Sequence, residues 1–435
     1  MEQETIDRTT IRGIRKNFFP YPLKGKQLDE KTGFYVDTIE ARTGDPVKSP
    51  IEDIFESCTG SSANFIHLLL GHRGCGKSTE INKLELKFKK EGFAVRKIDC
   101  QAETNFSNLK VEDILILISN ALLDICKEKE ININQSDVDI LNDFFVSIEE
   151  ETKFRETQEV DAKTGIGLNF SKIIKLVAEV KAHIMNTSDK MTTIREKIIK
   201  RFSEWNNCID NIIEKIKEKD NQRYPIIILE NFDKIVPTER AINLFKNGYL
   251  EKINTYIIYT FPIGLSYDAK FGTITQYALP HIFPMIDVKT KDGKKNDKGC
   301  KTMKAIIKKR AELNLFEENA IDLLIEKTGG SLRDVFNCIE QAAKYTDRRG
   351  KDKVSIEEVN MALNDEKYNY LSRRITVKDY PALNEIHRKK AEIENDRDML
   401  RFLEAHVVLE YNGKRWHDLH PLIYDFLKEN GRIEQ

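Results

Sequence analysis

The stretch GHRGCGKSTE at residues 71–80 constrains the possible folds of this chain more than any other. It follows the apolar run NFIHLLL and precedes STEINKLELKFKKE, where apolar residues recur among charges as in an amphipathic helix. The segment matches the pattern G-x-x-x-x-G-K-[ST] through Gly71, Gly76, Lys77 and Ser78. A strand, a glycine loop and a helix in this order predict a P-loop in an α/β fold with a parallel sheet.

The residue types of this loop suit phosphate binding. Glycines let successive backbone N–H groups point at phosphate oxygens, and the helix N-terminus adds a partial positive charge. We expect Lys77 to contact the β- and γ-phosphates of ATP and the Ser78 hydroxyl to bind Mg²⁺. The competing interpretation is an ordinary glycine turn, which the strand and helix context disfavours. The predicted cofactor-binding residues are Gly71, His72, Arg73, Gly74, Cys75, Gly76, Lys77, Ser78 and Thr79.

A P-loop site needs a second acid, and the candidate segment is YPIIILENFDKI at residues 224–235. Its consecutive aliphatic residues predict a buried strand with acids at the carboxyl end. Glu230 is then the predicted protein carboxylate for Mg²⁺. Asn231 stands where an acid normally orients the attacking water. An amide cannot accept that proton, so we expect weak hydrolysis unless Asp233 or another group substitutes. The alternative for Asp233 is a solvated loop pair with Lys234.

Further segments resemble those of a known family. They are ENFDK, YTFPIGLSY, TGGSLRDVFNCIEQAAKY and AHVVLEYNGKRWHDLHPLI. With the loop, they resemble AAA+ ATPases of the Orc1/Cdc6-like and STAND-related kind, and more closely a group of bacterial proteins known only as P-loop ATPases. The resemblance runs from GFYVDTIEARTG to the C-terminal hairpin. It implies an AAA+-like P-loop NTPase core with a parallel sheet, a helical insertion, a helical lid and a C-terminal winged helix.

The resemblance also implies roles for individual residues. Residues 71–78 correspond to the Walker A loop, and Glu230 with Asn231 corresponds to the Walker B acid pair. Thr260 holds the position of the sensor-1 polar residue. Arg333 holds that of the lid's sensor-2 arginine, against the alternative of a surface ion pair with Asp334 or another neighbour. With Asp233, these four residues are the predicted catalytic set.

Two departures from the family weaken the expectation of brisk hydrolysis. Relatives carry Asp-Asp where this chain has Glu230-Asn231. The segment YDAKFGTITQYALPHIF contains Lys270 but no arginine where AAA+ proteins place the finger that reaches a neighbour's γ-phosphate. We therefore expect an ATPase of low activity, below the enzyme median of about 10 s⁻¹.

Composition shifts and turn residues divide the chain into predicted units. A proline-punctuated arm covers the nucleotide side of the sheet, with SPIEDIFES a short helix that could border the adenine. Four helical patterns form the lid, and two β-prone runs around Asn412-Gly413 form the hairpin of the winged helix. The predicted boundaries are 1–63 for the arm, 64–298 for the ATPase core, about 130–222 for a helical insertion within it, 299–368 for the lid and 369–435 for the winged helix.

The insertion is predicted from chain length and pattern. The distance between the loop and the second acid exceeds the needs of a compact core by roughly a hundred residues. A helix is predicted over 170–185, next to the apolar, glycine-containing stretch at 164–170. A second apolar stripe recurs close to every 3.5 residues, which favours a seam closed within the chain over an oligomer contact. Its members are Ile194, Ile198, Phe202, Trp205, Ile209, Ile212 and Ile216.

Charge and composition bound the partners. Lys and Arg total 70 and Asp and Glu total 71, so no global field favours nucleic acid or a membrane. From Val377 to Gln435, ten basic residues face twelve acidic ones, a net charge of −2, which favours a protein-facing winged helix over a DNA-binding one. His417 and His420 could bind a metal, but hairpin and turn positions explain them more simply.

The cysteine content, the absence of long apolar runs and the motifs above lead to an expected compartment and function. Seven scattered cysteines without a CxxC pair indicate a reducing compartment, and no apolar run predicts a membrane span, so we expect a cytoplasmic protein. The favoured function is an ATP-dependent regulatory switch acting on a protein partner, an effector or another copy, with anti-phage or stress signalling suggested by resemblance. The alternative is a DNA-loading or transposition-type ATPase, and a weaker one is a scaffold that binds nucleotide without turnover.

Overall fold

A computed structural model describes residues 6–60, 65–145, 189–235, 237–391, 396–411 and 416–433. Its centre is a five-stranded parallel sheet in the order β2-β3-β4-β1-β5. The three central strands are buried throughout, as expected for parallel strands covered by helices. Their carboxyl ends meet at one edge, where ligands of open α/β sheets bind. The strands span Ile66–Gly71 (β1), Val95–Asp99 (β2), Ile226–Glu230 (β3), Tyr256–Pro262 (β4) and Ala278–Ile282 (β5).

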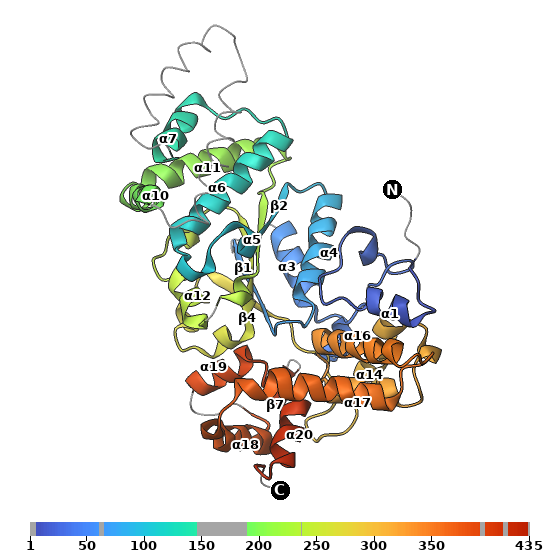
Figure 1. The fold of residues 1–435 in the computed structure, drawn as a ribbon. Coiled ribbons are helices and arrows are strands. Elements are labelled where there is room, and N and C mark those ends of the chain that lie inside the picture. Colours follow the sequence, from blue (N-terminus) through green and yellow to red (C-terminus); the bar gives the residue numbers. More distant parts are fainter. Residues whose placement is uncertain are drawn as a thin grey trace.

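Helices cover both faces of the sheet (Figure 1). Side chains of β3 alternate between the faces: Ile226 and Ile228 share a core with α3 and α4, whereas Ile227 and Leu229 share one with α6. The covering helices are Pro50–Thr59 (α3), Lys77–Lys90 (α4) and Val111–Glu128 (α6), with the shorter Cys100–Glu103 (α5), Thr238–Phe245 (α12) and Phe271–Ile274 (α13).

The described part of the predicted insertion is helical, and its apolar seam is closed within the chain. All seven seam residues are at most 8% exposed and belong to the same core as the sheet. The helix is interrupted at Arg201, so the seam runs along two consecutive helices. These helices lie at the opposite end of the molecule from the C-terminal elements (Figure 1). The segments predicted at 164–170 and 170–185 lie outside the described residues. The described helices are Gln135–Phe145 (α7), Asp189–Lys200 (α10) and Phe202–Lys219 (α11).

The N-terminal arm packs against the lid as well as against the sheet. The Phe18 ring meets Phe336 of the lid edge-on, with ring centroids 5.6 Å apart. The lid contains the four predicted helices, and the Ser331 hydroxyl caps the third by accepting a hydrogen bond from the Asp334 N–H at 3.4 Å. The arm contains Ile11–Asn17 (α1) and Ile39–Thr43 (α2), and the lid contains Asp297–Lys308 (α14), Ala320–Lys327 (α15), Leu332–Arg348 (α16) and Ile356–Asp365 (α17).

The C-terminal unit is a winged helix whose hairpin is docked on the core. Tyr411 and Trp416 stack across the hairpin with centroids 4.5 Å apart, and both are buried with Phe283. The predicted turn at Asn412-Gly413 and the wing tip lie outside the described residues. Within the described part of the chain, no helix is long and apolar enough to cross a membrane. The unit consists of Tyr380–Lys389 (α18), Asp396–Glu404 (α19), the antiparallel strands Val408–Tyr411 (β6) and Trp416–Leu419 (β7), and Pro421–Glu429 (α20).

Candidate functional site

The glycine loop lies between β1 and α4 at the carboxyl edge of the sheet. Gly74 and Gly76 have φ angles of 80° and 109°, a left-handed backbone that glycine adopts at little cost. Helix α4 begins at Lys77, directly after Gly76, so its unpaired N-terminal N–H groups lie beside the loop. Backbone donors and a helix N-terminus therefore converge where the sequence predicts them.

The ammonium of Lys77 is held inside this loop. Its Nζ donates hydrogen bonds to the carbonyl oxygens of Gly71 (2.8 Å) and His72 (2.9 Å) and lies 3.2 Å from Asp233 Oδ2. The Lys77 side chain is 4% exposed and that of Asp233 14% exposed. The alternative of a solvated Asp233–Lys234 pair is wrong, because Asp233 faces the loop lysine while Lys234 donates to a glutamine side chain.

Glu230 ends β3 beside the first turn of α4. Its carboxylate lies against the Ser78 hydroxyl and 3.5 Å from Lys97 Nζ. Burial raises the pKa of Glu230 above its ordinary value, although Lys97 and Ser78 act in the opposite direction. Among the described residues, the buried Oε1 of Glu230 has no hydrogen-bond partner. A buried carboxylate oxygen next to a hydroxyl fits a Mg²⁺ site that water and phosphate oxygens complete.

Asn231 and Asp233 follow the same strand but point to different places. Asn231 is left-handed (φ 75°); its N–H donates to Thr260 Oγ1 (2.9 Å) and its side-chain amide to Asp99 Oδ1 (2.5 Å). Thr260 is 1% exposed, so its hydroxyl holds the turn after β3. The backbone carbonyl of Asp233 accepts from Arg73 Nε of the loop (2.9 Å). The acid that contacts the loop lysine is therefore Asp233, and Asn231 is directed toward the end of β2.

The lid contacts the loop through Arg333, which lies in the first turn of α16 as predicted. The Arg333 N–H donates to the Gly74 carbonyl (3.3 Å), and a Cβ at Gly74 would lie only 2.6 Å from Arg333 Cβ. The alternative of an ion pair with Asp334 is wrong, because that carboxylate bonds His406 and His420. Within the described residues Arg333 forms no ion pair, so its charge is available beside the loop.

Arg42, in α2, clamps the loop from the arm. Its guanidinium donates to the carbonyl oxygens of Cys75 (2.6 Å) and Pro284 (2.6 Å) and to Thr38 Oγ1 (2.7 Å). The residue is 1% exposed. Sequence reasoning did not single it out, because no local pattern marks a residue whose partners lie up to 242 positions away. Its presence in GFYVDTIEARTG, a segment that resembles the family, is the only available signal.

A cavity of about 50 Å³ lies between the arm, the loop and the lid. Tyr35 of the arm, Thr79 of α4 and Phe336 of the lid line it, whereas no residue of α3 does. Tyr35 Oη donates to the Glu80 carboxylate (3.1 Å), and burial raises the pKa of Glu80 to about 7. Ligand pockets usually measure about 300–1,000 Å³, so a base fits here only if the arm or lid moves.

The loop also contacts the winged helix. The Glu410 N–H of β6 donates to His72 Nε2 at 2.8 Å. Burial lowers the pKa of His72 well below its ordinary value, so the ring is neutral and can accept this bond. The same ring packs edge-on against His406, with centroids 5.5 Å apart. One short loop thus touches the arm, the lid and the winged helix.

Comparison with known proteins gives structural matches only. No protein-family model and no curated protein matches the sequence. The parallel sheet, the loop after β1, the lid and the winged helix agree with the resemblance found in the sequence. The fold is AAA+-like.

Three solved structures illustrate this likeness of fold. The Aeropyrum pernix ORC2 protein has a TM-score of 0.41 and 12% identity, over 94% of this chain and 98% of that one. Cdc6p from Pyrobaculum aerophilum has a TM-score of 0.37 and 12% identity, over 91% and 99%. The Thermotoga maritima RuvB Holliday junction branch migration motor has a TM-score of 0.36 and 10% identity, over 91% and 97%.

Proposed function

We propose that this chain binds ATP with Mg²⁺ at residues 71–79 and acts as a slowly hydrolysing regulatory switch. The observation that carries the proposal is the convergence of Lys77, Asp233 and Glu230 on one glycine loop at the carboxyl edge of the sheet. An ordinary glycine turn has no need of a buried lysine and two acids. Phosphate and magnesium binding accounts for all three.

Each residue has a role that follows from its position. Lys77 would exchange its carbonyl partners for β- and γ-phosphate oxygens. Ser78 and Glu230 would hold Mg²⁺, which neutralises charge between those phosphates. Asp233, beside Lys77, would orient the attacking water, and Arg333 would add its guanidinium from the lid. Asn231 shapes the turn that positions Asp233.

The regulatory part of the proposal is supported by the contacts of the loop. A phosphate that rearranges the loop also disturbs the bonds from Gly74 to the lid and from His72 to the winged helix. The nucleotide state can therefore bias the position of both units. We infer that the output is a changed surface for a protein partner, an effector or another copy of the chain. Anti-phage or stress signalling is the setting suggested by the sequence resemblance.

Calorimetric titration of the full chain with ATP and Mg²⁺ tests the proposal. Lys77→Ala should abolish binding, because it removes the ammonium that the loop holds at the carbonyl oxygens of Gly71 and His72. Lys87→Ala is the matched control: Lys87 lies on the same helix but is 40% exposed, and its affinity should equal that of the unmodified chain. Equal affinity in Lys77→Ala would overturn the assignment of the loop.

A further inference from the structure

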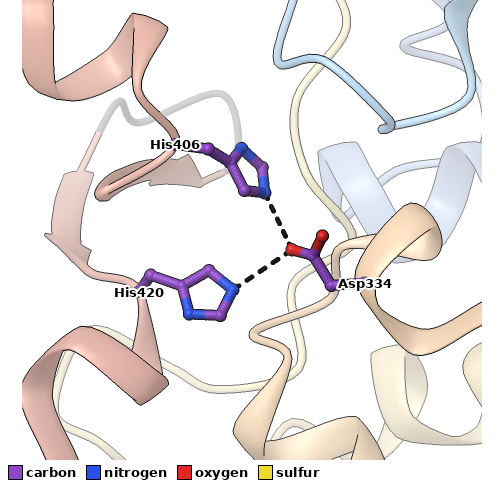
Figure 2. Close-up of side chains that lie close together, drawn as sticks. All are labelled: Asp334, His406 and His420. Carbon is purple, nitrogen blue, oxygen red and sulfur yellow. Dashed lines mark hydrogen bonds and ion pairs between the residues drawn. The ribbon is translucent and has the colours of Figure 1, made fainter. Parts of the chain in front are cut away.

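A buried cluster of metal-binding side chains joins the lid to the C-terminal unit (Figure 2). Asp334 comes from the first turn of α16, His406 from the turn between α19 and β6, and His420 from the N-cap of α20. Asp334 Oδ2 lies 3.1 Å from His406 Nε2 and 3.2 Å from His420 Nε2. The three residues are 5%, 7% and 0% exposed.

The donor atoms match a zinc site in type and spacing. Two imidazole nitrogens and one carboxylate oxygen are common Zn²⁺ ligands, at about 2.0–2.2 Å from the metal. Tetrahedral ligands at that distance lie about 3.3 Å apart, close to the two measured separations in the cluster. All three donor atoms lie within 4.8 Å of one another, so small side-chain rotations would bring the two nitrogens to the same spacing.

The backbone at His406 also suits a role for its ring in the cluster. His406 has a left-handed backbone (φ 60°), a conformation that is costly for a non-glycine residue and directs its ring into the cluster.

A hydrogen-bonded network without metal is the competing explanation. His420 Nδ1 accepts a hydrogen bond from the Leu422 N–H at 3.2 Å, which places the ring proton on Nε2, facing Asp334. Zinc binding would move that proton to Nδ1 and sacrifice the helix cap. The lost bonds are ordinary hydrogen bonds, and coordination to a structural zinc is stronger than their sum.

We propose that Asp334, His406 and His420 form a zinc site that fastens the winged helix to the lid. The Ser331 hydroxyl, 3.2 Å from His406 Nε2, or a water molecule would complete the coordination. His406 packs against His72 of the loop, so a metal that fixes the His406 ring also restrains the packing of the loop. This proposal does not depend on nucleotide binding.

The test uses the untagged full chain after treatment with a chelator, titrated with Zn²⁺ alone. We expect one equivalent of Zn²⁺ per chain with a dissociation constant of about 1 μM or tighter, and a higher Tm with zinc than without. Co²⁺ in place of Zn²⁺ should give the visible absorption bands of a tetrahedral site without sulfur-to-cobalt charge transfer. The chain has seven cysteines, and a charge-transfer band would mean that thiolates bind instead, which would overturn the assignment.

Two variants locate the site. Asp334→Asn and His420→Gln keep hydrogen-bonding groups of similar size, so the network can persist, but each should weaken Zn²⁺ binding by about 100-fold or more. His387→Gln is the control, because His387 lies in α18 outside the cluster and pairs with Asp418. Its zinc affinity should not change. Substoichiometric binding by the unmodified chain, or equal affinity in the two cluster variants, would leave the hydrogen-bonded network as the correct description.

Discussion

Asp233 and Asn231 are two residues apart, yet the structure gives them different surroundings. Asp233 lies at the loop lysine, whereas Asn231 donates to Asp99 at the end of β2. We expect Asp233→Asn to lower ATP turnover at least tenfold, because an amide cannot accept a proton from water. The affinity for ATP should stay equal or rise, because Lys77 loses its competing acid. Turnover assays combined with calorimetry measure the two effects separately.

Asn231→Asp is the companion variant. A carboxylate at this position would face the Asp99 carboxylate, so we expect unchanged turnover and a loss of unfolding free energy of about 1–2 kcal/mol. Faster hydrolysis in Asn231→Asp, with normal hydrolysis in Asp233→Asn, would place residue 231 at the reacting phosphate and reverse the assignment.

Glu80 should make stability depend on pH. Its pKa is raised to about 7 from an ordinary value of 4.5, so ionisation is harder in the folded chain than in the unfolded one. Stability is then lost as the pH rises from about 4.5 to 7. Glu80→Gln removes this loss: the variant should gain about 3 kcal/mol over the unmodified chain at pH 8, and the gain should disappear below about pH 4.5. Urea unfolding across this range measures the difference.

The exposed Glu56→Gln serves as the control for charge removal. A gain from Glu80→Gln that is the same at every pH would show that Glu80 does not titrate in this interval.

At the scale of elements, a buried ion pair joins α10 of the insertion to α6, one of the helices that cover the sheet. Arg195 of α10 donates through Nε and Nη2 to both carboxylate oxygens of Asp113 in α6, each at 2.8 Å, with both side chains at most 7% exposed. Arg195→Met leaves a buried charge and should cost about 3–5 kcal/mol of unfolding free energy. The double variant Arg195→Met/Asp113→Leu should recover all but about 1 kcal/mol of this unfolding free energy. The remaining loss reflects the missing hydrogen bond from the Lys110 N–H to the Asp113 carboxylate at the start of α6.

The exposed pair of Lys200 and Glu196 offers the contrast. Lys200→Met should change stability by less than about 1 kcal/mol, because that pair stays in water. If the double variant at the buried pair were as unstable as Arg195→Met, packing rather than the unpaired charge would be the source of the loss. Urea unfolding provides both values.

At the scale of the whole molecule, the winged helix packs its hairpin against the ATPase core. Its hairpin is buried against the core, and its charge from Val377 to Gln435 is −2. Duplex binding requires exposed cations that displace phosphate counterions. We therefore expect the full chain to show no salt-sensitive affinity for duplex DNA near physiological ionic strength, with or without ATP, in fluorescence anisotropy titrations. A micromolar complex that weakens steeply with salt and is lost in Lys414→Ala/Arg415→Ala would favour the DNA-loading alternative.

Residue patterns within one element predicted much of this protein. The loop at 71–78, the four lid helices with Ser331 as a cap, and the strands of the C-terminal hairpin are found where the sequence placed them. In each case the deciding interactions join residues a few positions apart. Glycine torsions, helix caps and apolar periodicity act over that range, so they can be read without knowledge of the fold.

Contacts between distant residues were decided only by the tertiary structure. The sequence places Asn231 and Asp233 after the same strand, but the packing of β2 beside β3 turns the first toward Asp99, while the second faces the loop. Arg42 reaches Pro284, and Asp334 meets two histidines more than seventy positions away. Periodicity says which face of an element is buried, but not which other element covers it. The residues of the loop follow from the sequence, and their partners from the packing of separate elements around it.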